Sequence, residues 1–223
     1  MDKGQAIDAY SATRSTIETH LANLELIIVS SGQSLEGNSF YVHNTLHRYD
    51  ELLTKQVNLF WQGKQASSRI CEIGFNAGHS ALLMLVGREA SPIDFTIFDI
   101  GSHKYTRPTL EYMKVQFPHA RMEYIEGDST VTMSAWIAEN SQNVHSYDLV
   151  HVDGGHSEHC IRNDLQNAII LVKPGGIVIV DDTNVSYIND YVNSYIASGM
   201  CVEVDVFPTQ GYPHRILRTA AVV

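Results

Sequence analysis

The chain has 223 residues, 15 basic and 25 acidic side chains and a formal net charge of -10, and this length suits one domain with a full hydrophobic core. No Lys/Arg cluster interrupts the negative charge, so a nucleic-acid backbone would be repelled, and we expect no nucleic-acid partner unless folding gathers a local basic patch. The N-terminus has no basic-then-apolar signal pattern, and the apolar stretch 24–29 is too short to span a bilayer, so we expect a cytoplasmic protein with no membrane partner.

Two helical patterns occupy the N-terminal part of the chain. Apolar residues recur at helical spacing through 5–30, a loop-like segment follows at 32–38, and a second helical pattern covers 46–61. We therefore expect a helical extension or lid, residues 1–62, beside a main domain, residues 63–223. The extension could also provide a dimer surface for a homo-oligomer. Packing or surface positions are expected for four side chains: Phe40, Tyr41, His43 and His47.

From residue 69 onward, strand-like and helix-like segments alternate, which predicts a parallel sheet covered on both faces. The expected strands are 69–73, 94–100, 122–126, 147–152, 176–180, 200–207 and 214–219. The expected helices are 79–89, 107–117, 131–140, 158–171 and 187–198. The last two strands are joined by so short a link that they should pair as an antiparallel hairpin. The predicted fold class is therefore α/β, with a doubly wound, mostly parallel seven-stranded sheet, N-terminal helices and an antiparallel C-terminal hairpin.

The stretch 69–80 (RICEIGFNAGHS) is a short apolar strand that ends in an acid and then turns into a helix. Such a turn leaves backbone N–H groups free at the helix start, where a polar or anionic ligand group can dock. A dinucleotide fingerprint would need glycine at the positions of Asn76 and His79, and no Gly-Lys-Ser/Thr of a P-loop follows. A nicotinamide-dependent oxidoreductase is disfavoured for this reason.

What remains, Glu72-x-Gly74-x-x-x-Gly78 after a strand, resembles the first motif of class I S-adenosylmethionine (SAM)-dependent methyltransferases, which have a Rossmann-like fold. The resemblance implies that the glycines make room for the methionine moiety of SAM and that the acid orients the loop. It also implies that Asp99, at the end of the second strand, binds the ribose hydroxyls, and that Asp128 and Ser129 after the third strand contact the adenine. For Asp128, a helix N-cap before residue 131 is an equally weighted alternative. The cofactor-binding residues expected on this basis are Glu72, Gly74, Phe75, Asn76, Gly78, Ser80, Asp99, Ile100, Asp128, Ser129 and Asp153.

Three carboxylates, Asp153, Asp181 and Asp182, follow the fourth and fifth strands and should converge on one edge of the sheet. Crowded carboxylates repel one another unless a cation neutralises them, and hard oxygen ligands suit Mg²⁺. This arrangement resembles metal-dependent O-methyltransferases, such as catechol O-methyltransferase and the sugar O-methyltransferases of macrolide and aminocoumarin biosynthesis. The resemblance implies that the three acids hold Mg²⁺ and that His156 is the catalytic base. The alternative for His156 is a helix cap or a cofactor contact.

The remaining residues of interest are expected to have structural roles. A zinc site on His151 and His159 is disfavoured, because these residues would lie inside a strand and a helix. Asp164 is expected to form an ion pair or to orient its helix, and residues 173–176 to form a turn. A packed helix face is expected from three tyrosines: Tyr187, Tyr191 and Tyr195. Buried free thiols are expected at the three cysteines: Cys71, Cys160 and Cys201.

The sequence thus predicts a Mg²⁺-dependent O-methyltransferase that moves the methyl group of SAM to a hydroxyl of a small molecule, such as a sugar, a phenol or another natural product. A metal-independent SAM methyltransferase and a non-catalytic SAM-binding protein are the alternatives.

Overall fold

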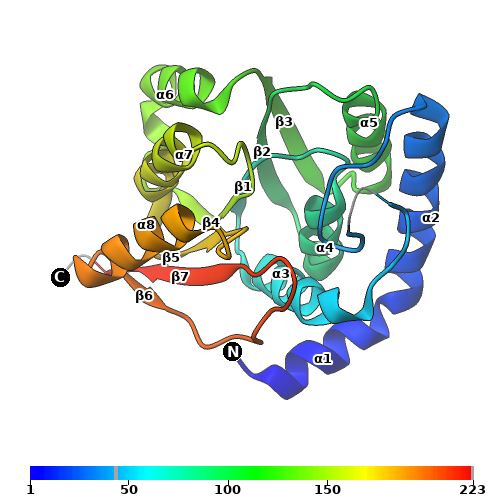
Figure 1. Ribbon diagram of the computed structural model, residues 1–223, viewed down its shortest axis with the longest axis horizontal. Helices are drawn as coiled ribbons and strands as arrows, with labels where there is room; N and C mark the ends of the chain where they lie inside the picture. The colour runs from blue at the N-terminus through cyan, green and yellow to red at the C-terminus, as the bar shows by residue number, and fades with distance from the viewer. Residues whose placement is uncertain (43–44, 222–223) are drawn as a thin grey trace.

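The computed structural model describes residues 1–42 and 45–221, so that His43 lies outside the described residues (Figure 1). The helices are α1 Lys3–Ala12, α2 Arg14–Ser31, η1 Asp50–Leu52, α3 Leu53–Gln65, α4 His79–Arg88, α5 Thr106–Gln116, α6 Ser129–Glu139, η2 Ser141–Asn143, α7 Glu158–Leu171 and α8 Ser186–Ala197. The strands are β1 Arg69–Ile73, β2 Ile93–Asp99, β3 Ala120–Glu126, β4 Tyr147–Val152, β5 Val172–Val180, β6 Cys201–Glu203 and β7 Arg215–Thr219.

The strands form one seven-stranded sheet in the order β3-β2-β1-β4-β5-β7-β6. Strands β1 to β5 are parallel, whereas β7 runs antiparallel to both β5 and β6. The predicted fold class and its C-terminal hairpin are therefore confirmed. The chain winds outward from β1 to β3 and then returns to place β4 beside β1. This reversal leaves a crevice at the carboxyl ends of β1 and β4, where ligands bind in sheets of this kind.

Each face of the sheet is covered by its own set of helices (Figure 1). Ile70 of β1 and Leu149 of β4 point into a core that they share with α1 to α5. Cys71 and Val150, the next residues along the same strands, point into a second core with α6, α7 and α8. Successive residues of a strand alternate between faces, so the near-continuous apolar runs of these strands fill both cores.

The N-terminal helices belong to the first of these cores. Residues of α1, α2 and α3 pack in one cluster with α4 and the sheet, and α3 runs through residue 62, where the extension was predicted to end. The first helical pattern is divided at Thr13, whose hydroxyl donates to the carbonyl of Tyr10. The second helix starts at Leu53 rather than near residue 46, because Tyr49 donates its backbone N–H to Phe40 and is held in an extended segment.

Two expectations near the C-terminus are wrong in detail. Residues 173–176 are part of β5, where the register against β4 shifts between Val172 and Ile177. β6 ends at Glu203 instead of continuing to residue 207, because the chain then turns toward α3, where the backbone of Phe207 bonds to the Asn58 side chain.

The cysteines and tyrosines lie largely as expected. All three cysteines are free, but Cys160 is only partly buried and lines a cavity. Tyr187, Tyr191 and Tyr195 pack against the second core. Within the described part of the chain, no helix is both long enough and apolar enough to cross a membrane.

Candidate functional site

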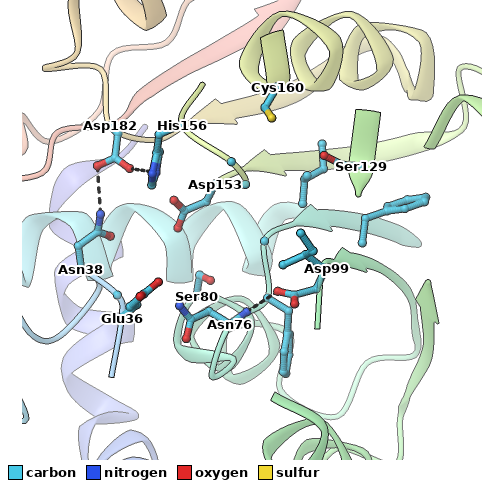
Figure 2. A pocket seen from close by; sticks show the side chains of 18 of the residues that line it. Glu36, Asn38, Asn76, Ser80, Asp99, Ser129, Asp153, His156, Cys160 and Asp182 are labelled. Atoms are coloured by element: carbon cyan, nitrogen blue, oxygen red, sulfur yellow. Dashed lines mark hydrogen bonds and ion pairs between the residues drawn. The ribbon is translucent and has the colours of Figure 1, made fainter. Parts of the chain in front are cut away.

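A cavity of about 830 Å³ lies at the carboxyl ends of the parallel strands (Figure 2). It is lined by most of the residues predicted to bind ligands: Gly74, Phe75, Asn76, Ser80, Asp99, Ile100, Asp128, Ser129, Asp153, His156 and Asp182. Glu72, Gly78 and Asp181 do not line it. The N-terminal segment, which the sequence left unassigned to the site, adds Glu36, Asn38 and Ser39 to the wall.

The turn after β1 forms part of the cavity wall. Gly74 has a φ of +89°, and a Cβ at this position would overlap the carbonyl oxygen of Asp153. Only glycine fits here, because the turn presses against the end of β4 in a conformation that other residues avoid. The β1 turn and the β4 loop therefore form one continuous wall.

Glu72 stands behind this wall and fixes the elements that form it. Its side chain is fully buried, and Oε1 accepts a hydrogen bond from Ser80 Oγ at 2.6 Å and pairs with His151 Nδ1 at 3.0 Å. Glu72 thus joins β1 to the start of α4 and to β4. Its side chain does not line the cavity.

Asp99 orders the same turn from the neighbouring strand. One carboxylate oxygen accepts the backbone N–H of Asn76 at 2.8 Å, and the other accepts that of Gly101 at 2.7 Å. A carboxylate has about four acceptor positions, so two remain for hydroxyl donors in the cavity. Ile100 follows the end of the strand and exposes 64% of its surface.

Asp128 caps helix α6, in agreement with the alternative given for it. Its Oδ1 accepts the backbone N–H of Thr130 at 2.9 Å and the Thr130 hydroxyl at 2.7 Å. The hydrogen bond from the Thr130 side chain, followed by the one from its backbone, lowers the pKa of Asp128. Both Asp128 and Ser129 also line the cavity.

Two of the three predicted acids, Asp153 and Asp182, lie near His156 at the other end of the cavity (Figure 2). One candidate ligand atom from each of Asp153, His156 and Asp182 lies within 4.8 Å of the others. The Nε2 atom of His156 is 2.6 Å from Asp182 Oδ2. Asp182 has a φ of +53°, an uncommon backbone conformation for a residue other than glycine that often occurs at functional sites.

Electrostatics in this cluster follow from burial and close packing. Burial, with the neighbouring Asp181 carboxylate, raises the pKa of Asp153 well above its usual value. The hydrogen bond with Asp182 raises the pKa of His156. Burial alone would raise the pKa of Asp182, but its contact with His156 outweighs this effect and lowers it. A cation placed beside Asp153 would favour the ionised form of its carboxyl group.

The donor set therefore fits a hard divalent cation. Asp153 and Asp182 offer carboxylate oxygens at the cavity wall, the ligand type that Mg²⁺ prefers. A second group of close candidate atoms comes from His151, Asp153 and Asp181. His151 is fully buried, and its Nδ1 is bonded to Glu72.

Asp181 is occupied by a partner that the sequence analysis did not identify. The Nζ atom of Lys55 in α3 lies 2.6 Å from Asp181 Oδ2, and both side chains are almost completely buried. The available signal was the position of Lys55 three residues after Leu52 and four before Leu59, on the apolar face of its helix. A lysine on such a face requires a buried partner.

Comparisons with known proteins bear on the family and the fold of this chain. A family model described as a methyltransferase domain matches residues 71–183, just over half of the chain. No curated protein matches the sequence.

Solved structures with a similar fold include cofactor-bound Rv0187 from MTB, with a TM-score of 0.63 and 15% identity over 91% of this chain and 89% of that one. The O-methyltransferase from Bacillus cereus in complex with SAH has a TM-score of 0.61 and 16% identity, covering 91% of this chain and 90% of that one. The O-methyltransferase TomG from Streptomyces achromogenes, in complex with SAM, has a TM-score of 0.55 and 15% identity, covering 75% and 80%. At these identities the likeness shows the fold.

Proposed function

Because the chain belongs to the methyltransferase-domain family and has the fold of class I SAM-dependent methyltransferases, we propose that it is a divalent-cation-dependent O-methyltransferase acting on a small molecule. The main supporting observation is the grouping of Asp153, His156 and Asp182 beside the glycine turn, in one cavity. The O-methyltransferases among its structural neighbours, one of them bound to SAH and one to SAM, support the choice of oxygen as the acceptor atom.

We assign the cofactor and the acceptor to separate parts of the cavity. The Gly74 turn and Asp99 face the region proposed for the methionine and ribose parts of SAM, with Asp128 and Ser129 beyond them near the adenine. Asp153 and Asp182 would hold the cation at the opposite end, where Asn38 and His156 complete the wall. An acceptor hydroxyl between these two regions would lie next to the methyl group.

When bound, SAM supplies an activated methyl group and the cation lowers the pKa of the acceptor hydroxyl. His156 takes the hydroxyl proton, since its ring is largely open to the cavity and its ordinary pKa is close to neutral. The turn and Asp99 fix the cofactor relative to the acid cluster. Such positioning can contribute roughly 7 to 11 kcal/mol in ideal cases.

The proposed function is tested by following methyl transfer from labelled SAM to a panel of sugars, phenols and other hydroxyl compounds. We expect transfer with Mg²⁺, loss of transfer after EDTA treatment, and recovery when Mg²⁺ is restored. SAM alone should raise the melting temperature, and Asp99→Ala should reduce that rise. Full activity in EDTA would contradict metal dependence, and SAM binding without transfer to any acceptor would favour a non-catalytic SAM-binding protein.

A further inference from the structure

Lys55 carries an ammonium group into the interior beside the acid cluster. Its side chain is fully buried, and Nζ donates to Asp181 Oδ1 at 2.8 Å and to Asn38 Oδ1 at 2.6 Å. A buried charge is costly unless it is paired and hydrogen-bonded. The pairing of Lys55 with Asp181 is therefore expected to be a permanent part of the folded protein.

Asn38 connects this buried pair to the cavity wall. Its Oδ1 accepts from Lys55, so its Nδ2 is directed to Asp182 Oδ1, which it reaches at 3.1 Å (Figure 2). The other oxygen of Asp182 pairs with His156. Both ends of the Asn38 amide are thus used, and its orientation follows from the lysine.

The two adjacent acids consequently have different surroundings. Asp181 exposes 2% of its surface and does not line the cavity, and it also accepts the backbone N–H of Asp182 at 2.9 Å. Asp182 lines the cavity together with Asp153. The ammonium of Lys55 balances the charge of Asp181. The carboxylates of Asp153 and Asp182 remain, and their combined negative charge balances that of one divalent cation.

We propose that Lys55 is a positioning residue that withdraws Asp181 from the metal ligands, so that the divalent cation is held by Asp153 and Asp182. This inference rests on the proposed metal-dependent function and sharpens it. It assigns to the N-terminal helices a direct part in organising the metal site. It also revises the sequence-based expectation that all three acids are ligands.

The test needs a variant that removes both charges of the buried pair. Asp181→Asn alone would leave the Lys55 ammonium without its partner, free to compete with the cation for Asp153 and Asp182. Replacing both partners avoids an unpaired buried charge, so we choose Lys55→Met combined with Asp181→Asn. The variant Lys55→Gln with Asp181→Asn, which retains hydrogen bonding, serves as a second version.

The measurement is Mn²⁺ binding, followed by electron paramagnetic resonance on the whole protein. We expect the neutral pair to bind Mn²⁺ with an affinity within about threefold of the wild type. Asp182→Asn should weaken binding by about tenfold or more. Lys173→Met combined with Asp148→Asn is the matched control, because it neutralises both partners of another Lys–Asp pair, at the opposite end of the sheet. It should leave Mn²⁺ affinity unchanged.

The outcomes separate this inference from the proposed function. Loss of Mn²⁺ binding in the neutral pair, equal to that in Asp182→Asn, would show Asp181 to be a ligand and overturn the inference while metal dependence stands. Absence of Mn²⁺ binding from the wild type would overturn both, and the SAM-induced rise in melting temperature would then show whether the cofactor site stands. If neither double variant folds, the wild type itself provides the test. The ¹⁵Nζ NMR resonance of Lys55 should keep its chemical shift when Mg²⁺ saturates the protein, because the Lys55–Asp181 pair stays intact. A change in that chemical shift, to the value of an unpaired lysine, would overturn the inference.

Discussion

His156 and Asp182 are in contact but differ in their exposure to solvent. The imidazole exposes 61% of its side chain and the carboxylate 9%, so the histidine can reach a substrate while the acid stays fixed. The contact raises the pKa of His156 above its ordinary 6.5. A base must be unprotonated to act, so the proposed role implies a rate that rises with pH through the pKa of this histidine.

We predict that His156→Ala lowers kcat by about 100-fold or more, in the range typical of lost general-base catalysis. The acidic limb of the pH–rate profile should disappear with it, whereas Mn²⁺ binding should remain. His103→Ala is the control, since His103 lines the same cavity but pairs with Glu36 at 3.2 Å. An unchanged rate and pH profile would refute the base assignment, and lost Mn²⁺ binding would make His156 a ligand instead.

The position of Lys55 depends on how closely α3 packs against α4. A Cβ on Gly63 of α3 would overlap the backbone of Met84 in α4, and one on Gly87 of α4 would overlap the carbonyl oxygen of Phe60 in α3. The two helices thus approach each other backbone to backbone at both glycines. This close approach brings α3, with Lys55, up to the ends of β4 and β5.

We predict that Gly63→Ala destabilises the protein by about 1 to 3 kcal/mol through overpacking, even though alanine favours helix. Gly4→Ala in α1 is the matched control, because its added Cβ would come no closer than 3.5 Å to another group. That variant should be neutral or slightly stabilised. Urea unfolding measures both, and equal stabilities of the two variants would contradict the packing argument.

Across the whole molecule, the N-terminal helices and the C-terminal hairpin are joined to each other. Lys3 pairs with Asp205 at 2.7 Å. Asn58 of α3 bonds to the backbone of Phe207 and donates from Nδ2 to His214 Nε2 at 3.0 Å. Because Nε2 of His214 must accept from Asn58, the histidine is held neutral, and burial lowers its pKa from 6.5 to about 3.

His214 should therefore make the protein sensitive to acid. An unfolded histidine binds a proton below about pH 6.5 and the folded one does not, so stability falls as the pH drops from 6.5 toward 3. We predict that the wild type loses about 1 to 2 kcal/mol more than His214→Gln between pH 7 and pH 5, since glutamine still accepts from Asn58 without titrating. Unfolding in urea at both pH values gives the difference. Parallel pH dependence in the two proteins would exclude His214 as the cause.

The wild type and His214→Gln must be compared at each pH, because other titrating groups also change the stability in acid, some lowering it and some raising it. Burial lowers the pKa of His79 to about 4, which adds to the loss in acid. Burial raises the pKa of Asp164 to about 6, which opposes it, because the folded protein then binds the extra proton. These contributions are common to the wild type and the variant and cancel in the difference.

The sequence alone determined the succession of strands and helices, the glycine turn after β1 and the presence of Asp99, Asp153 and Asp182 at strand ends. These features are local, since a parallel sheet brings the carboxyl ends of its strands to one edge whatever surrounds it. Only the tertiary structure decided that Asp181 faces Lys55 and Asp182 faces the cavity, and that Asn38 joins them. Lys55 and Asp181 are 126 residues apart, and their pairing results from the backbone contact between α3 and α4, which no local pattern encodes.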